Sequence, residues 1–373
     1  MVAVTGSPKV LQVITDTDRR GAQLFAVSLA PELVRRGFAV ETVALAAGTS
    51  ASLDVEVLGS RPLGSTTLRA LRERSKMAAV LVAHGSTALP ACFLATLGTR
   101  RPFVYRNIGD PYYWGSTRAR RARTMLFLSR ASRVVALTDE TARRLNEIYR
   151  VPPRRMVTIP QAVSTADFPR RSPASRARAR EALGIADDAK VAVCIGALSP
   201  EKSVPDAVRA VARLPPAWQL LVAGEGPERP AVADEALAAG AGRVRLLGQI
   251  QDTAELLSAA DVLVLPSLTE GLPGVLIEAA MTGVPAVATD VGFVDDVIDD
   301  GITGFVVAPG DPGALANAII RGEAAGLERL GEAANRRAQD RFSLTVAADR
   351  WADTLRSVAG ADTGRRGGTR CCA

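Results

Sequence analysis

The chain has 373 residues and a net charge of +7 at pH 7, with 47% hydrophobic and 23% charged residues. This length exceeds what one hydrophobic core usually serves, so we expect two domains, and the composition is that of a globular chain and not of a disordered one. Since no uninterrupted apolar run approaches the roughly 18–20 residues that a bilayer requires, we expect no membrane-spanning helix. The opening MVAVTGSPKVLQVIT lacks the basic and apolar regions of a secretory signal, so we expect none.

The four cysteines form neither a disulfide framework nor a metal-binding spacing. Cys92 and Cys194 lie in apolar runs, and we expect both to be buried. Cys371 and Cys372 end a polar tail, and we expect residues 361–373 to be disordered. This cysteine usage fits a reducing compartment and predicts a cytoplasmic protein.

Short β-branched runs alternate with helix-length segments through the first half of the chain. The expected strands are Val10–Thr15, Val40–Val43, Ala79–Ala83, Phe103–Tyr105, Arg133–Leu137 and Met156–Ile159. The expected helices between them are Ala22–Arg36, Thr87–Leu97, Thr117–Ser129 and Glu140–Tyr149. This alternation is typical of βαβ units around a parallel sheet.

The second half repeats the alternation. Its expected strands, each followed by a helix, are Val191–Ile195, Gln219–Ala223, Val244–Leu247, Val262–Leu265, Ala286–Ala288 and Phe305–Val307. The segment 160–178 is rich in Pro, Ser and Arg and interrupts the pattern, so we place the boundary between two α/β domains after residue 168. We expect the carboxyl ends of both strand sets to face a shared cleft, because ligands of open α/β sheets bind at those ends.

The stretch 262–304 carries the strongest functional signal, VLVLPSLTEGLPGVLIEAAMTGVPAVATDVGFVDDVIDDGITG. Its strand ends at Pro266, a loop carries Glu270, and Pro273 suits the first position of the following helix. The free N–H groups near Pro273 and the helix dipole form an anion site suited to a diphosphate. Glu278 follows about 7 Å along the helix axis, where its carboxylate can accept both hydroxyls of a ribose.

Together with the downstream sequence TDVG at 289–292, this stretch resembles the E-x7-E region of family-4 glycosyltransferases, with Glu270 and Glu278 as its two glutamates. The resemblance covers nearly the whole chain. It implies the α/β architecture called the GT-B fold, in which two Rossmann-like domains have parallel sheets facing an interdomain cleft. It further implies a donor-binding domain over 169–342 and a helix over 343–360 that returns to the first domain.

The resemblance assigns roles to the residues of this loop and helix. Glu270 is expected to act in catalysis by accepting hydroxyls of the transferred sugar. The expected donor-binding residues, besides Glu278, are Gly271, Leu272, Pro273, Gly274 and Val275.

Two further segments are similar to donor-binding parts of the family. The loop CIGALSPEK at 194–202 matches the loop that holds donor phosphates with an Arg and a Lys. Lys202 matches the Lys and is expected to stabilise the departing diphosphate, whereas Ala197 stands at the Arg position. Gly248 and Ile250 lie at the end of a strand, where the backbone of family members meets the nucleobase.

In the first domain, the family has a Gly-Gly pair near the donor phosphates, and this chain has Arg20-Gly21. Gly21 keeps the permissive backbone that a close approach needs. His84, the only histidine, follows a strand and is an acceptor-side candidate; a structural role is an equal alternative.

Many family members place an active-site histidine just after the strand Phe103–Tyr105, and this chain departs from that pattern. We expect Asn107 or Asp110 to replace it as a catalytic partner of the reacting sugar. Arg106 is expected to bind phosphate or an acidic acceptor.

Charge is uneven along the chain. Residues 1–169 contain 24 Lys and Arg against 12 Asp and Glu, a net +12, whereas the remainder contains 22 against 27, a net −5. The first half also has an aromatic and basic segment, YYW at 112–114 followed by Arg118, Arg120, Arg121 and Arg123. These arginines are spread around the expected helix, which favours an acceptor-side or solvated surface; peripheral contact with the inner face of a membrane is the alternative.

The predicted function is transfer of a sugar from a nucleotide-diphosphate sugar to an acceptor, with retention and without a metal ion or other cofactor. The acceptor is left open among a saccharide, a lipid-linked glycan and a small molecule, and no nucleic-acid partner is expected. A non-catalytic nucleotide-sugar-binding subunit and a sugar-nucleotide epimerase of the same fold are the alternatives. A dinucleotide-binding dehydrogenase is excluded, because Arg229 stands where the third glycine of that fingerprint belongs.

Overall fold

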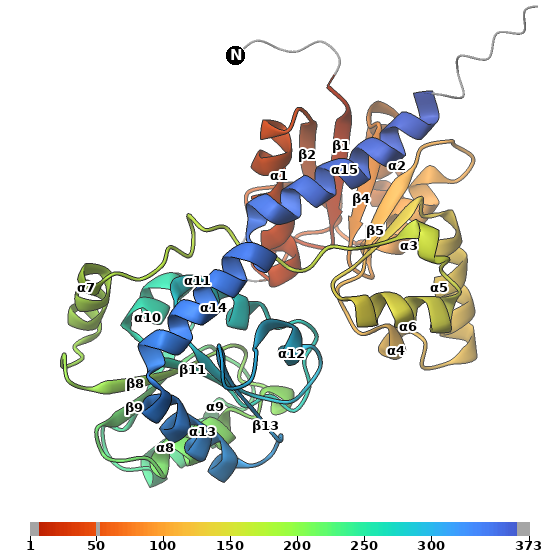
Figure 1. Ribbon diagram of the computed structural model, residues 1–373. Helices are drawn as coiled ribbons and strands as arrows, with labels where there is room; N and C mark the ends of the chain where they lie inside the picture. Colours follow the sequence, from red (N-terminus) through yellow and green to blue (C-terminus); the bar gives the residue numbers. More distant parts are fainter. Residues whose placement is uncertain (1–6, 50–52, 364–373) are drawn as a thin grey trace, which may run out of the picture. The chain divides into compact units, whose positions relative to one another are not determined.

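The structure is a computed structural model, and it describes residues 7–49 and 53–363 (Figure 1). Cys371 and Cys372, with the rest of the expected tail from residue 364 onward, lie outside the described residues. The chain divides into two compact units. The first is Met1–Gln161 with Leu344–Ala373, and the second is Ala162–Ser343.

The division between the units precedes the boundary expected after residue 168. Val163 already belongs to the second unit, because its N–H donates to the carbonyl oxygen of Phe342 at 3.0 Å. Val163 also forms a parallel bridge with Ser343. The segment rich in Pro and Ser therefore begins the second unit and does not end the first.

Within the described residues, the first unit has a seven-stranded parallel sheet with the order β3-β2-β1-β4-β5-β6-β7. The strands are β1 Lys9–Ile14, β2 Ala39–Ala44, β3 Glu56–Val57, β4 Val80–His84, β5 Phe103–Arg106, β6 Arg133–Ala136 and β7 Met156–Thr158. The helices are α1 Gly21–Arg35, α2 Ser65–Met77, α3 Ala88–Thr96, α4 Pro111–Trp114, α5 Arg118–Arg130, α6 Asp139–Tyr149, η1 Pro153–Arg155 and α15 Leu344–Thr363.

Helices cover both faces of this sheet, so alternate strand residues enter two different cores. Leu81 and Tyr105 pack in one cluster with residues of α2, α3, α5 and α6. Ile14 and Ala44 pack on the other face with Ala26 of α1. Burial on both faces explains why the strands have nearly continuous apolar sequences.

The helix α15 belongs to the first unit and lies beside α1 (Figure 1). The ring of Trp351 on α15 and the ring of Phe25 on α1 have centroids 6.4 Å apart. The helix continues to Thr363, so the first three residues of the expected disordered tail are helical.

The second unit has a six-stranded parallel sheet in the part of the chain that is described, with the order β10-β9-β8-β11-β12-β13. The strands are β8 Lys190–Ile195, β9 Trp218–Ala223, β10 Val244–Gly248, β11 Val262–Leu265, β12 Ala286–Thr289 and β13 Gly304–Val307. The helices are α7 Pro173–Leu183, η2 Pro200–Lys202, α8 Val204–Ala212, α9 Arg229–Ala238, α10 Thr253–Ala259, α11 Gly274–Thr282, α12 Val294–Val297, α13 Pro312–Ala325 and α14 Leu327–Phe342.

Two buried clusters also flank the second sheet. Cys194 and Cys92 are free and buried, as expected, and burial raises the pKa of the Cys194 thiol to about 12. Among the helices that the structure describes, none is both long enough and apolar enough to cross a bilayer.

Candidate functional site

The candidate donor site lies at the carboxyl ends of β8 and β11 in the second unit. The loop after β8 ends in η2 with Lys202, and the loop after β11 carries Glu270. Lys202 Nζ donates to Glu270 Oε1 at 2.6 Å, and the hydroxyl of Ser267 donates to the same oxygen at 2.7 Å. The structure therefore brings together two predicted site residues that are far apart in the sequence.

This ion pair is largely shielded from water. The Glu270 side chain is 8% exposed and the Lys202 side chain 29% exposed. A buried carboxylate needs such compensation, because an unpaired charge loses its hydration without replacement. Lys202 therefore neutralises Glu270, and Ser267 provides a second donor that the sequence did not single out.

Neighbouring backbone contacts fix the two loops. The N–H of Leu268 donates to the carbonyl oxygen of Glu201 at 2.8 Å, which joins the Lys202 loop to the Glu270 loop. The Thr289 hydroxyl donates to the Ser267 carbonyl oxygen at 2.5 Å. Gly292 has a φ of +61°, and a Cβ there would overlap the Glu270 carbonyl oxygen, so only glycine fits this approach.

The start of α11 presents an anion-binding end. Pro273 is the N-cap residue, one position before its expected place, and the helix begins at Gly274. Within the described chain no side chain caps this end. The first N–H groups of a helix lack intrahelical partners, and the helix dipole places partial positive charge there. Gly271 and Leu272 lead into this end, and Val275 lies in its first turn.

Glu278 lies one turn into α11 and is half-buried. A Cβ placed on Gly274 would lie 3.9 Å from Glu278 Oε1, so the carboxylate reaches back toward the helix start. Burial raises the pKa of the Glu278 carboxyl to about 7, because the charged form has lost water. A ligand hydroxyl that donates to this carboxylate would stabilise its charged form.

The expected nucleobase-binding residues lie at the end of β10. The carbonyl oxygen of Gly248 accepts from the N–H of Gly224 at 2.8 Å, which joins the end of β10 to the turn after β9. Ile250 is half-buried two residues further on and packs against the core of the unit. Contact of these residues with a base stays a prediction.

In the first unit, Gly21 begins α1, whose N-cap residue Arg20 makes no side-chain cap bond. A Cβ at Gly21 would meet no described atom within 4 Å, so the space beside it is open. Packing among the described residues therefore does not require glycine at this position.

His84 and Arg106 are both buried in the first unit, on the side of α1 and α15. His84 Nε2 lies 3.0 Å from Gln12 Oε1, and its ring centroid is 6.1 Å from that of Trp351. Burial and the nearby Arg106 charge lower the pKa of His84 well below its usual value. A neutral structural histidine is the simplest role for this geometry.

Arg106 has an unusual environment for a guanidinium. It is completely buried, stacks 3.8 Å above the Phe25 ring and donates to Gln161 Oε1. Its Nε and Nη1 have no hydrogen-bond partner among the described residues. Burial lowers the pKa of Arg106 to about 9. As described, Arg106 is not accessible to a phosphate or an acidic acceptor, contrary to the expectation from its position after β5.

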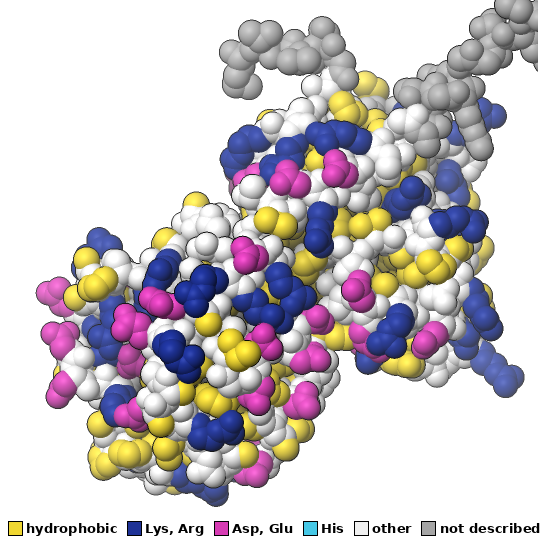
Figure 2. Space-filling view, viewed as in Figure 1, with side chains coloured by type: hydrophobic (Ala, Val, Ile, Leu, Met, Phe, Trp, Pro, Cys, Tyr) yellow, Lys and Arg dark blue, Asp and Glu magenta, His cyan; other side chains and the backbone are white. Residues whose placement is uncertain are grey.

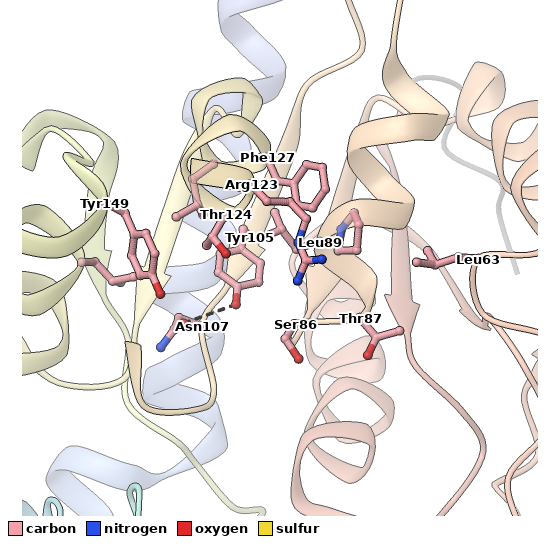
Figure 3. A pocket seen from close by; sticks show the side chains of 13 residues that line it. Leu63, Ser86, Thr87, Leu89, Tyr105, Asn107, Arg123, Thr124, Phe127 and Tyr149 are labelled. Carbon is pink, nitrogen blue, oxygen red and sulfur yellow. Dashed lines mark hydrogen bonds between the residues drawn. The ribbon is translucent and has the colours of Figure 1, made fainter. Parts of the chain in front are cut away.

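Asn107 and Asp110 follow the end of β5, and Asn107 lies on the face of the sheet opposite α1. Asn107 Oδ1 accepts from the Tyr105 hydroxyl at 3.3 Å, and Asn107 lines a cavity of the first unit (Figure 3). Asp110 caps α4 by accepting from the N–H of Tyr112 at 2.9 Å. Asn107 is therefore placed to meet a ligand, whereas Asp110 has a structural role in its loop.

The aromatic and basic segment spans α4 and α5. Arg121 Nε donates to the Ile148 carbonyl oxygen at 2.6 Å, so this arginine joins α5 to α6. Arg118, Arg120 and Arg123 are exposed.

On the face of the second unit shown in Figure 2, Lys and Arg side chains are interspersed with Asp and Glu.

Paired Rossmann-like units with parallel sheets define the GT-B class of glycosyltransferases, and solved structures of this class match nearly the whole chain. HepE of Anabaena, in complex with UDP and glucose, is 22% identical, with a TM-score of 0.82 over 94% of this chain and 100% of that one. Sucrose-phosphate synthase of Thermosynechococcus elongatus is 20% identical, with a TM-score of 0.79 over 95% and 100%. The expected GT-B fold is confirmed.

The chain belongs to glycosyltransferase family 4. The family model described as Glycosyltransferase Family 4 matches residues 19–167, and the model described as Glycosyl transferases group 1 matches residues 189–322, so the two together cover most of the chain.

Curated relatives match a smaller part of the chain. D-inositol 3-phosphate glycosyltransferase of Geodermatophilus obscurus is 36% identical over 227 residues, 57% of this chain and 49% of that protein. The protein of the same name from Mycobacterium tuberculosis is 32% identical over 203 residues, 51% of this chain and 40% of that one. The match therefore spans about half or less of the length of these relatives.

Proposed function

We propose that the protein transfers a sugar from a nucleotide-diphosphate sugar to an acceptor hydroxyl. The observation that carries this proposal is the contact of Lys202 and Ser267 with Glu270, directly ahead of the uncapped start of α11. It places a cation, a carboxylate for sugar hydroxyls and an anion-binding helix end in one set of connected loops.

In the proposed reaction, the bond between the anomeric carbon and the leaving diphosphate oxygen breaks as the acceptor oxygen bonds to that carbon. The acceptor attacks from the face that the diphosphate leaves, its hydroxyl gives its proton to the departing diphosphate oxygen, and the nucleoside diphosphate leaves. Lys202 and the α11 dipole stabilise the charge on the departing diphosphate while the sugar gains oxocarbenium character. Retention and independence of metal ions are part of the proposal, as the family resemblance implies. The nucleotide sugar is a co-substrate, and no resident cofactor takes part.

The ionised carboxylates bind the donor hydroxyls. Glu278 accepts from the ribose and Glu270 from the transferred sugar, since carboxylate oxygens accept stronger hydrogen bonds than neutral amides do. HepE is described in complex with UDP and glucose, which makes UDP-glucose the first donor to test.

Thermal unfolding in the presence of nucleotides tests the donor site. A ligand that binds only the folded protein stabilises it by about 2.7 kcal/mol at a concentration of 100 Kd. We expect one nucleoside diphosphate and its sugar to raise Tm, and Glu278→Gln to reduce that rise. Glu181→Gln changes an exposed carboxylate on α7 of the same unit and should leave the rise unchanged. If no nucleotide in a panel of UDP, GDP, ADP and their sugars raises Tm, the proposal fails.

Product analysis then separates the proposed activity from its alternatives. A transferase releases nucleoside diphosphate at a rate that depends on the acceptor. An epimerase changes the sugar without releasing nucleotide, and a non-catalytic subunit binds the donor and leaves it unchanged. The presence of Lys202, Glu270 and Glu278 in one unit favours the transferase.

A further inference from the structure

The first unit contains a cavity of about 270 Å³ beside β4 and β5 (Figure 3). Ser86 and Thr87 line it just beyond the end of β4, and Asn107 lines it just beyond the end of β5. Helices α3, α5 and α6, together with Leu63 ahead of α2 and Tyr105 on β5, supply the remaining walls. Ligands of open α/β sheets bind at the carboxyl ends of strands, so this cavity lies where a ligand is expected.

The cavity walls are mostly apolar. Leu89, Pro90, Phe127, Leu128 and Leu145 line it, and the Phe127 ring is held by a contact with Phe93 whose centroid distance is 5.0 Å. This volume and composition suit a rigid body of one or two rings.

Two tyrosines in the lining already use their hydroxyl hydrogens. Tyr149 donates to the Pro111 carbonyl oxygen at 2.6 Å, and Tyr105 donates to Asn107. The two tyrosine hydroxyls can therefore only accept hydrogen bonds from a ligand and cannot donate to it. A molecule with hydroxyls on all sides, such as a saccharide, would turn several of them toward apolar walls without partners.

One charged side chain lines the cavity. Arg123 extends from α5 among the lining residues (Figure 3), and the lining contains no Asp or Glu. Arg123 has no ion-pair partner within the described parts of the chain. A ligand with one negative group would therefore be complementary to this cavity.

We propose that this cavity binds the acceptor and that the acceptor is an amphipathic small molecule, with an apolar ring body between the helices and an anionic group at Arg123. That the ligand is the acceptor rests on the proposed glycosyl transfer, whereas the chemistry of the ligand is inferred from the lining of the cavity. Inositol phosphate, which occurs in the names of the curated relatives, has hydroxyls around its ring and fits these walls poorly.

Two fluorescent probes with one ring skeleton test this proposal. Anilinonaphthalene sulfonate carries a negative charge, and phenylnaphthylamine is the same skeleton without it. We expect the wild-type protein to bind the anionic probe at one site, and Thr124→Trp, which fills the cavity from α5, to weaken binding about tenfold or more. Leu126→Trp is the matched control, because Leu126 lies on the same helix, is 56% exposed and does not line the cavity.

Arg123→Gln tests the anionic group. This substitution should lower the affinity for the anionic probe by about fivefold, as for the loss of an exposed ion pair, and leave the affinity for the neutral probe unchanged. Arg118→Gln, at another exposed position of α5, should change neither. Equal effects of Arg123→Gln on both probes would overturn the anionic group. Equal binding by Thr124→Trp and Leu126→Trp, both with wild-type circular dichroism, would overturn the cavity as the binding site.

The same variants separate this inference from the proposed function. Thr124→Trp should retain stabilisation by the nucleotide sugar, because Lys202, Glu270 and Glu278 belong to the second unit. If a nucleotide stabilises the protein but Thr124→Trp does not change probe binding, the proposed transferase activity stands and the inference about the cavity is overturned. If the probes behave as expected but no nucleotide stabilises the protein, the cavity stands as a binding site and the proposed transferase activity is overturned.

Discussion

Lowering the pH through 7 should weaken donor binding through the protonation of one carboxyl, Glu278. Burial raises the pKa of the Glu278 carboxyl to about 7. The ribose hydroxyls should bind the ionised form, because a carboxylate accepts both and a protonated carboxyl loses one acceptor. Affinity for UDP-glucose should therefore be highest above pH 8 and fall as Glu278 gains its proton.

The size of this effect follows from the pKa. At pH 6, about one molecule in ten has Glu278 ionised, so affinity should fall about tenfold from its value at high pH, or about 1.4 kcal/mol. Glu278→Gln should lose about 1.5–3 kcal/mol of binding at pH 8, the range for hydrogen bonds to charged groups. The variant should also lose most of the pH dependence.

Folding stability should change in the opposite direction. The folded state raises the pKa of this carboxyl from its ordinary value of 4.5, so the folded protein binds more protons than the unfolded chain between pH 4.5 and 7. Stability due to this group is therefore present at low pH and is lost as pH rises to 7, by up to about 3 kcal/mol. Above pH 7, Glu278→Gln should raise Tm in the absence of donor.

Titration calorimetry with UDP-glucose at pH 6, 7 and 8 measures these effects, and buffers of different ionisation enthalpy report the proton released at pH 7. The donor has no group that titrates in this range. The single histidine, His84, has its pKa lowered well below the usual value, so it does not interfere. An affinity independent of pH in the wild type, or the same pH dependence in Glu278→Gln, would refute the reasoning.

Three further predictions concern the ion pair, metal ions and membranes. Lys202→Met should abolish turnover and lower Tm, because it leaves the Glu270 carboxylate shielded and unpaired; wild-type kcat in this variant would exclude the proposed role. Turnover should persist in a chelator of divalent ions, and complete loss restored by magnesium or manganese would contradict metal independence. The protein should bind anionic and neutral vesicles equally; a preference for anionic vesicles that disappears with raised salt or in Arg118→Gln/Arg120→Gln would instead support membrane contact.

Most of the sheet strands that the sequence revealed have buried apolar residues, and the half-buried strands β7 and β10 were also predicted. The strand β3, Glu56–Val57, was not predicted, because it has two residues and both are exposed. The helix α2 was also missed, since its sequence STTLRALRERSKM is polar and buries only Thr67, Leu71 and Ser75. Apolar periodicity predicts elements with wide buried faces and fails for short or narrow ones.

Prediction of the site depended on which residues lie close together in the sequence. Glu270 and Glu278 share a loop and helix, so their placement followed from the motif. The contact of Lys202 with Glu270 joins residues from different strand ends, and only the packed sheet shows it. The buried environment of Arg106 was not predicted, because β5 extends one residue further than expected. Strand alternation then places Arg106 on the face of α1, opposite Asn107 on the face of the cavity.

The ion pair between Lys202 and Glu270 has a consequence for which anions can occupy the donor site. A free phosphate that bound Lys202 would remove the cation that pairs with Glu270. It has no group that could replace this cation at the Glu270 carboxylate. A sugar diphosphate brings an anion for Lys202 and hydroxyls for Glu270 in the same molecule. Because Lys202 and Glu270 neutralise each other, the pair should disfavour small anions and favour ligands that satisfy both partners together.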